Sequence, residues 1–477
     1  MENKQRFPGF IGPSNVMRVT RFDAERTVNL YLEASPLGIG KGNEPMSLNS
    51  LPGLELLFTL GAGPIRAVYQ VSADNAVYIV SGNQIWKMIN TALTPTLIGT
   101  MLTSSGFVGV ADNGIQVVFV DGFNGYYSTL ADASPTITVI NDPHFYPAST
   151  VTFQDGYFIF GQNSSIYFFL SDLYAVTFSP LNQSGKAGNS DILAGVVSNN
   201  RELYVFGQNT TEIWWDSGLS GSTPFTRQDG KFSQIGCLAP GSIARLFNTV
   251  MWLGSSPEGG AVVYQMQNDT AVRVSNHAIE TSLQKVSVNL IFSTAKVKQS
   301  EGHYYYELDV IGLDTTWVYD LATSQWFERQ SNINGVVGRH LAQGHAYFNG
   351  LHVSGDYTNG NVYADNFDLG TDNGQPITWT RRTPHSSQSL NRIFYKLLEV
   401  DFQPGTTDAD PLTLRISNDG AKTFGNPIYA SQGALGDYLA RARWQILGQS
   451  RDRVFEVSGS APVKLLSAMV DVEVGTN

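Results

Sequence analysis

Apolar and polar residues alternate along most of this chain, and Gly, Asn and Asp interrupt the alternation at short intervals. The pattern is clearest in the runs Ala67–Val71, Ala76–Val80 and Gln84–Met88, which are separated by turns at Asp74–Asn75 and Gly82–Asn83. A period of two places one face of each strand toward a core. Asn, Asp and Gly tolerate the positive φ of tight hairpins. The stretch therefore predicts a meander of short antiparallel strands.

The same motif recurs along the chain: an apolar run, a polar turn and a closing aromatic. The closing aromatics are Trp86, Tyr126, Tyr167, Trp214, Tyr264, Trp317 and Tyr363, at spacings of 40 to 53 residues. Repeats of about 40–50 residues with about four strands each are typical of β-propellers. We therefore predict that residues 61–372 form a propeller of about seven blades, with each aromatic on an inner or third strand. The alternative is an array of β-sandwiches whose spacing is accidental.

The segments that flank the repeats are expected to differ from them. Residues 1–60 contain two alternating stretches but are too short for a core of their own, so they should pack on the C-terminal domain or close the propeller. Residues 373–477 contain six longer runs, Ile377–Arg382, Ile393–Phe402, Leu412–Ser417, Arg441–Ile446, Val454–Val457 and Lys464–Val474. They predict a β-sandwich-like, ring-forming domain. The expected fold class is all-β, with one helix at His277–Val286 capped by Asn276.

Charge and cysteine content narrow the range of possible functions. The 477 residues carry a net charge of −11, and Arg381–Arg382 and the pairs Arg441/Arg443 and Arg451/Arg453 are the only visible basic clusters. A protein that grips nucleic acid usually shows a basic patch, so tight binding of DNA phosphates is not expected. The single cysteine, Cys237, permits no intrachain disulfide and reads as a small buried hydrophobe. Without an apolar signal region, folding in a reducing, cytosol-like compartment is expected.

The sequence contains few motifs that could form a catalytic or metal-binding site. Ser417–Phe424 matches the Asp-box of sialidases, in which it is a structural hairpin turn; here it occurs once, outside the repeats. Asp365–Gly374 is rich in oxygen ligands but lacks EF-hand spacing, so a solvated linker is expected rather than a calcium site. Histidines 277, 303, 340, 345, 352 and 385 show no metal spacing, and His303–Glu307 reads as a strand. We expect no catalytic, cofactor-binding or metal residues, and no enzyme.

Short motifs spread over nearly the full length indicate a family. They are Val28–Tyr31, Leu51–Gly53, Thr210–Ile213, Val318–Trp326, Leu414–Gly420 with Gly425, Arg443–Trp444 with Gly448, and Pro462–Leu465. In their order, and with this chain length, they resemble the tail-hub proteins of short-tailed, podovirus-like phages. These are also called nozzle, packaged-DNA stabilisation or head-completion proteins.

The resemblance implies a structural protein of the virion tail, made in the host bacterial cytoplasm. It implies a homo-hexameric ring below the portal and the head-to-tail adaptor, which closes the DNA channel after packaging and takes part in genome ejection. Tailspikes or tail fibres and a tail needle or plug would bind to it, in part through long propeller loops at Leu181–Asp191, Asp216–Gly230 and Val274–Asn289. DNA would pass through the lumen without tight sequence-specific binding, and no membrane anchor or cofactor is implied.

Two other classes of protein stay open. The single Asp-box, with large aromatics near turns at Trp214–Trp215 and Ser324–Phe327, is compatible with a carbohydrate-binding or glycosidase-type propeller. A generic propeller adaptor is the third reading. The assembly state distinguishes them, because a hub forms rings on its adaptor whereas an enzyme or a generic adaptor would be a monomer.

Overall fold

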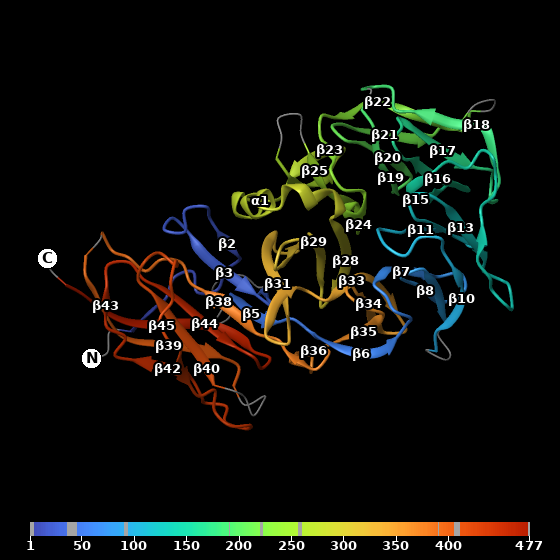
Figure 1. Cartoon of the computed structure of the whole chain (residues 1–477). Helices are drawn as coiled ribbons and strands as arrows, with labels where there is room; N and C mark the ends of the chain where they lie inside the picture. Colours follow the sequence, from blue (N-terminus) through green and yellow to red (C-terminus); the bar gives the residue numbers. More distant parts are fainter. Residues whose placement is uncertain are drawn as a thin grey trace.

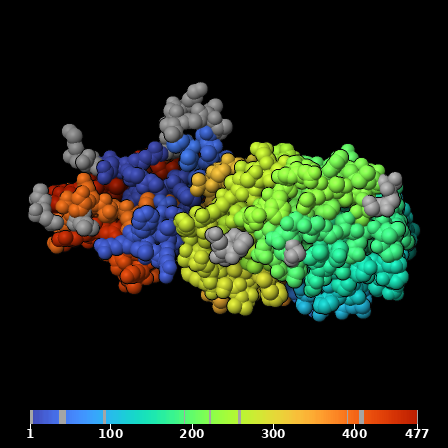
Figure 2. Space-filling model, turned by 90° about the horizontal axis from the view of Figure 1, so that it is seen from above, coloured from blue at the N-terminus to red at the C-terminus, as the bar shows by residue number. Residues whose placement is uncertain are grey.

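The computed structural model describes residues 4–35, 45–89, 94–189, 191–219, 223–255, 260–389, 391–404 and 411–475. In this part of the chain the strands form a β-propeller and a β-sandwich (Figure 1). Seen from above, the sandwich lies at one end of the molecule and the propeller at the other, and N-terminal residues cover part of the sandwich and its border with the propeller (Figure 2). The expected all-β fold is confirmed.

The first four blades are four-stranded antiparallel meanders in chain order. Blade 1 contains β7 (Ile65–Val71), β8 (Ala76–Ser81), β9 (Gln84–Ile89) and β10 (Thr96–Thr100). Blade 2 contains β11 (Gly109–Asp112), β12 (Gln116–Val120), β13 (Gly125–Thr129) and β14 (Thr138–Val139). Blade 3 contains β15 (Ala148–Gln154), β16 (Tyr157–Gln162), β17 (Tyr167–Ser171) and β18 (Phe178–Gly185). Blade 4 contains β19 (Leu193–Asn199), β20 (Glu202–Gly207), β21 (Thr211–Asp216) and β22 (Phe225–Ser233).

The last three blades depart from this plan. In blade 5 the inner strand is divided into β23 (Gly236–Cys237) and β24 (Ala244–Leu246), with η1 (Pro240–Ser242) between them. Both pair with β25 (Thr249–Ser255), and β26 (Val262–Gln267) and β27 (Thr270–Arg273) complete the blade. Blade 6 contains β28 (Thr294–Ser300), β29 (His303–Asp309), β30 (Thr316–Asp320) and β31 (Gln325–Ile333), whose end pairs with β32 (Val336–Arg339). Blade 7 takes β33 (Ala342–Phe348), β34 (Leu351–Asp356) and β35 (Asn361–Asn366) from the repeats.

The fourth strand of blade 7 is β6 (Gly53–Thr59), which pairs antiparallel with β35. The inner strands β7 and β33 then contact each other and close a ring of seven blades in the described residues. All seven closing aromatics lie on the third strand of their blade, as the repeat predicts. The short β36 (Thr371–Asp372) and β37 (Gln375–Pro376) extend the same sheet beyond β6.

The helix expected after blade 5 is α1 (His277–Gln284), which precedes η2 (Ser287–Phe292). The side chain of Asn276 accepts a hydrogen bond from the backbone N–H of Ile279, which is the predicted N-cap. Ile279 and Leu283 are buried among aliphatic residues of blade 5 and aromatics of blade 6, so the helix fills space at the rim of that interface.

The sandwich is built from both ends of the chain. One sheet has the order β4 (Leu30–Ala34), β5 (Met46–Ser50), β45 (Lys464–Val474), β39 (Ile393–Phe402) and β42 (Ala442–Gln445), with β1 (Lys4–Arg6) on β45 and β43 (Gln449–Ser450) on β39. The facing strands are β38 (Trp379–Arg382), β44 (Val454–Gly459), β40 (Leu412–Ser417) and β41 (Ile428–Ala430). Trp379, Trp444 and Phe455 are buried in the core between the two sheets.

Strand β3 (Ala24–Val28) connects the two bodies, and β2 (Asn15–Val16) pairs with it. Val28 pairs in parallel with Glu328 of blade 6, while Arg26–Val28 pair antiparallel with β38 of the sandwich. Arg26 forms a bidentate ion pair with Glu328, with Nε–Oε1 3.0 Å and Nη2–Oε2 2.7 Å, and Ser14 donates to the same carboxylate. Blade 6 and the sandwich therefore share one continuous sheet.

Arg381 holds the N-terminal segment against the sandwich. Its guanidinium is fully buried and donates to the carbonyls of Gly9, Phe10 and Pro13 and to the hydroxyl of Thr27, at 2.6 to 3.0 Å. Arg382 donates from Nε and Nη2 to a single carboxylate oxygen, Oε2 of Glu456, at 2.9 and 2.6 Å. The basic pair noted in the sequence is thus engaged in internal contacts instead of forming a surface patch.

The interface between blades 6 and 7 is ionic, whereas hydrophobic clusters fill the other interfaces between neighbouring blades. The Lys296 ammonium lies 3.1 Å from Glu307 and from Asp309, and Lys298 of blade 6 pairs with Asp365 of blade 7. Beside them Arg329 lies 3.5 Å from Glu307, and Arg339 lies 3.6 Å from Asp309. Lys296 and Arg329 lower the pKa of Glu307 to about 2 against the effect of burial.

The structure corrects the interpretation of Asp365–Gly374 as a solvated linker. The Asp365 side chain is 6% exposed in its pair with Lys298, and Asp372 is 2% exposed. Ser331 Oγ donates to Asp372 Oδ2 at 2.6 Å, and His340 Nε2 lies 3.9 Å from the same oxygen. The acidic residues belong to the ionic interface because β36 folds back onto β6, a non-local pairing that the spacing does not reveal.

We predict that Arg381→Met lowers the free energy of unfolding by about 3–5 kcal/mol, because the carbonyls of Gly9, Phe10 and Pro13 each lose a hydrogen bond from the buried guanidinium. Urea denaturation measures the change. Arg201→Met is the control: this side chain is 80% exposed, and its loss should alter stability by less than about 0.5 kcal/mol. Equal stability of the two variants would contradict the anchoring role of Arg381.

We also predict a pH-dependent role for Asp372. Burial raises its pKa to about 6 from 3.8, so the folded state binds this proton more tightly than the unfolded chain. The resulting stabilisation is complete below the unfolded pKa and is lost as the pH rises through about 6. Relative to Asp372→Asn, the wild-type free energy of unfolding should fall by about 3 kcal/mol between pH 4 and pH 7.

Burial lowers the pKa values of His340 and His345, so their titrations oppose that of Asp372, and comparison with the variant subtracts the part of them that does not depend on the Asp372 carboxylate. Arg329 and Asp365, which also act on Asp372, are unchanged in both proteins. Asp368→Asn, at an exposed carboxylate in the same loop, is the matched control and should show no such pH-dependent difference. A flat difference between wild type and Asp372→Asn would refute the assignment.

Candidate functional site

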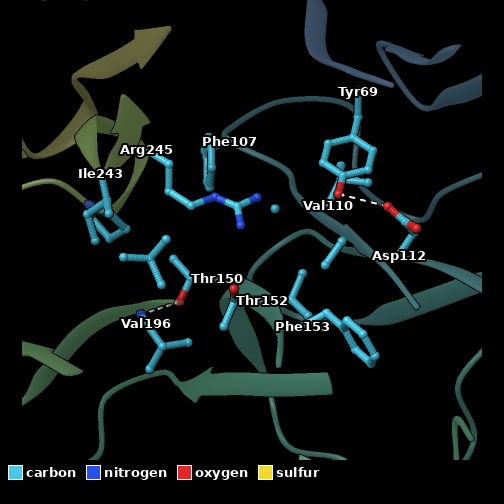
Figure 3. A pocket seen from close by; sticks show the side chains of 15 residues that line it. Tyr69, Phe107, Val110, Asp112, Thr150, Thr152, Phe153, Val196, Ile243 and Arg245 are labelled. Carbon is cyan, nitrogen blue, oxygen red and sulfur yellow. Dashed lines mark hydrogen bonds between the residues drawn. The ribbon is translucent and has the colours of Figure 1, made fainter. Parts of the chain in front are cut away.

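A cavity with a volume of about 350 Å³ lies in the propeller channel, between the inner strands of blades 1 to 5. Tyr69 comes from β7, Asp112 from β11, Thr150 and Thr152 from β15, and Arg245 from β24. Figure 3 shows the Arg245 side chain extending across the cavity beside Phe107, with Tyr69 and Asp112 on another wall. The blade arrangement thus gathers residues that are far apart in sequence.

One wall of the cavity is rigid. The Thr150 hydroxyl accepts a hydrogen bond from the backbone N–H of Val196, and Thr152 accepts one from Ser198, both at 3.0 Å. Two residues further along β15, Gln154 accepts from the Ser198 hydroxyl. These contacts join the inner strands of blades 3 and 4, where backbone groups of neighbouring blades do not pair directly. The spacing of two along β15 places all three side chains on one face.

The charged groups of the cavity lie on different walls. Tyr69 Oη donates to Asp112 Oδ2 at 3.0 Å, and the Gly114 N–H donates to Oδ1 at 3.2 Å. Burial together with the Asp112 carboxylate raises the pKa of Tyr69, so the phenol keeps its proton. Arg245 is exposed and donates to the Ser198 carbonyl at 3.4 Å. Within the described residues Arg245 has no carboxylate within 4.0 Å.

The Asp-box forms the turn between β40 and β41. Asp419 accepts hydrogen bonds from the backbone N–H groups of Lys422 and Thr423, at 3.0 to 3.1 Å, and from the hydroxyls of Ser417 and Thr423. These donors lower the pKa of the carboxyl. Phe424 packs beneath the guanidinium of Arg382, 4.7 Å from its ring centroid. The motif is a structural hairpin turn, as the sequence predicts.

The histidines lie in separate places. His345 and His352 hydrogen-bond each other at 3.0 Å on β33 and β34, and His303 bonds Asp320 at 2.8 Å in blade 6. His385 bonds Asp452 and the Thr20 carbonyl in the sandwich. In the described part of the chain, no group of three or more His, Cys, Asp or Glu side chains could hold a metal ion. Burial raises the pKa of Cys237 to about 12, which fits a buried structural residue.

The aromatics near turns divide into core and surface residues. Trp214, Trp326 and Phe327 are buried, whereas Trp215 is 47% exposed. The three long connections expected from the sequence are only partly loops. Leu181–Asp191 begins within β18, which extends to Gly185, and Asp216–Gly230 includes the first residues of β22. Val274–Asn289 holds α1. Residues 190 and 220–222 of these connections lie outside the described residues.

The sandwich exposes a run of apolar side chains, which we call the sandwich apolar segment. It comprises Ile428, Tyr429, Leu435, Tyr438, Leu439 and Ile446. Leu439 and Ile446 are each 91% exposed, and Ile446 also adopts a positive φ of 55°. A β-branched residue with a positive φ is strained. An apolar side chain that is exposed to water also gains none of the free energy that burial would give. These residues lie on β41 and in the connections on either side of β42.

Sequence analysis missed the cavity residues. Tyr69, Asp112, Thr150 and Arg245 lie in ordinary alternating strands, and their only signal is that each precedes or lies within the first strand of a repeat. The inner strands of blades 1 to 5 carry the cavity residues, and only the closed ring of blades brings them together.

Two family models match consecutive parts of the chain. "Bacteriophage P22 Gp10, beta-propeller" matches residues 8–369, and "Bacteriophage P22 Gp10, beta-sandwich" matches residues 378–475. No curated protein matches the sequence significantly. Among solved structures, a chain of the "Crystal Structure of Mitotic Checkpoint Complex" is 11% identical, with a TM-score of 0.39, over 68% of this chain and 95% of that chain. No described helix has the length and apolar character needed to cross a membrane.

We predict that Asp419→Ala lowers the midpoint of thermal unfolding at pH 7 by a few degrees, because the turn loses its acceptor for four donors. Calorimetry measures the shift. Lys422→Ala is the matched control, since only the backbone of Lys422 takes part in the turn, and it should leave the midpoint unchanged. Loss of a hydrolytic activity on sialosides with unchanged stability would instead indicate an enzyme.

Proposed function

Because this chain belongs to the phage tail-hub family of bacteriophage P22 Gp10, we propose that it is the hub, or nozzle, of a short phage tail. The protein is a structural component of the phage tail and thus of the virion. The observation that carries the finer proposal is that propeller and sandwich follow each other in family order over nearly the whole chain. Synthesis would take place in the cytoplasm of the bacterial host.

The proposed hub is a homo-hexameric ring below the portal and its head-to-tail adaptor. It closes the DNA channel after packaging and takes part in genome ejection. The sandwich apolar segment is the proposed contact with the next copy, since a closed ring uses the same two surfaces on every subunit. A permanent ring needs interfaces on the order of 2,000 Å² or more, and exposed residues such as Leu439 and Ile446 supply apolar area for them.

The propeller would then lie outward and bind tailspikes or tail fibres and a tail needle or plug through its long connections. DNA would slide through the ring without being held. The net charge of −11 supports this, because a lumen poor in Lys and Arg releases few counterions from DNA. Arg441 and Arg443 pair with Glu399, each at 3.0 Å, which further reduces the free basic charge of the sandwich.

We predict that Leu439→Glu with Ile446→Glu prevents ring assembly on the adaptor while leaving the monomer folded, because both side chains are fully at the surface. Cryo-electron microscopy of the protein on its connector, with thermal unfolding as the folding check, tests this. Leu181→Glu, at a 73% exposed propeller position, is the control and should still form rings. Rings in the double variant, or a channel wall of clustered Lys and Arg, would refute the arrangement.

A further inference from the structure

We propose that the channel cavity binds an acidic saccharide, with Arg245 contacting the carboxylate and the Tyr69–Asp112 pair contacting the hydroxyls. This proposal does not depend on the role of the protein as a hub. It rests on the groups that face one cavity of about 350 Å³, near the lower end of the range for small-molecule sites. A single sugar unit fits that volume, whereas a folded protein segment does not.

Arg245 supplies the anion contact. A guanidinium carries five N–H donors in a planar fork that matches a carboxylate. The long bond to the Ser198 carbonyl uses one of them, and the described ion pairs do not include Arg245. Figure 3 shows the guanidinium within the cavity, so its remaining donors are directed at the space that a ligand would fill.

Tyr69 and Asp112 supply the hydroxyl contact. The Asp112 carboxylate receives one phenol and one backbone donor, and two oxygens accept about four hydrogen bonds in all. The Asp112 carboxylate can therefore accept further hydrogen bonds, which neighbouring hydroxyls of a sugar can donate. The same negative charge disfavours a polyphosphate or a nucleic acid strand, which would bring several negative charges next to it.

Phe107 supplies an apolar surface. Its side chain is 37% exposed and lies beside Arg245 on the cavity wall. The electron-rich face of an aromatic ring attracts the weakly positive C–H groups on one side of a pyranose. The Thr150–Val196 and Thr152–Ser198 hydrogen bonds hold the opposite wall in place, so the cavity is formed before a ligand arrives.

The probes are glucuronate, glucose and acetate, titrated into the full-length protein and followed by calorimetry and saturation-transfer NMR. Glucuronate should bind with a Kd of about 1 mM, the affinity expected of a ligand of this size. Glucose should bind at least about tenfold more weakly because it lacks the group that Arg245 contacts. Acetate should not compete, because it lacks the hydroxyls.

Arg245→Gln should weaken glucuronate binding at least about tenfold and leave glucose binding unchanged. Asp112→Asn should weaken both sugars. Arg201→Gln is the matched control: this arginine lies on the β19–β20 turn of blade 4, outside the cavity, and should bind like wild type. Arg245 is exposed, so its substitution leaves the fold intact, which the thermal midpoint checks.

Equal affinity for acetate and glucuronate would show a general anion site and overturn the proposal. So would unchanged glucuronate binding in Arg245→Gln, or no saturable binding of glucuronate at several millimolar. None of these outcomes affects the hub proposal, which is decided by ring assembly alone.

Discussion

In the part of the chain that the structure describes, strands of the N-terminal segment pair with blade 6, blade 7 and the sandwich at the border between the two domains, and the rest of the structure depends on this pairing. An unpaired strand edge exposes backbone N–H and C=O groups that bind other chains or aggregate. Here β6 completes blade 7, and β3 joins blade 6 to β38. Strands β4 and β5 extend the sandwich beside β45. One short stretch of chain therefore closes the ring and fastens it to its neighbour.

The ring is not equally robust around its circumference. Most blades meet through buried Phe, Tyr, Val and Ile, whose contribution changes little with pH or salt. Blades 6 and 7 meet instead through Lys296, Lys298, Glu307 and their partners, where geometry and protonation decide the free energy. The same interface adjoins β6 and the shared sheet of β3. Chemical conditions thus act most strongly on the region where the two bodies are joined.

Much of the fold was predictable because it is local. Hairpin strands alternate with period two, so the limits of β39, β40 and β45 agree with the runs Ile393–Phe402, Leu412–Ser417 and Lys464–Val474. The turn at Asp419 was also recognisable, since its donors lie within four residues. Non-local pairing was not predictable, because no sequence pattern near Asp372 indicates that this residue contacts Ser331 and β6. Arg245 likewise becomes a cavity residue only once the blades form a ring, so candidate site residues could not be selected from the sequence.

The pairing of β1 with β45, with Lys4 opposite Asp471, has a consequence for the order of folding. Strand β1 therefore pairs with a strand that is synthesised only after the whole propeller and most of the sandwich. Contacts between residues far apart in sequence form slowly, because closing a long loop costs entropy before any hydrogen bond forms to offset that cost. Until then both bodies carry open strand edges in a crowded cell. The nascent chain is therefore most exposed to misassembly in the interval between synthesis of blade 6 and synthesis of β45.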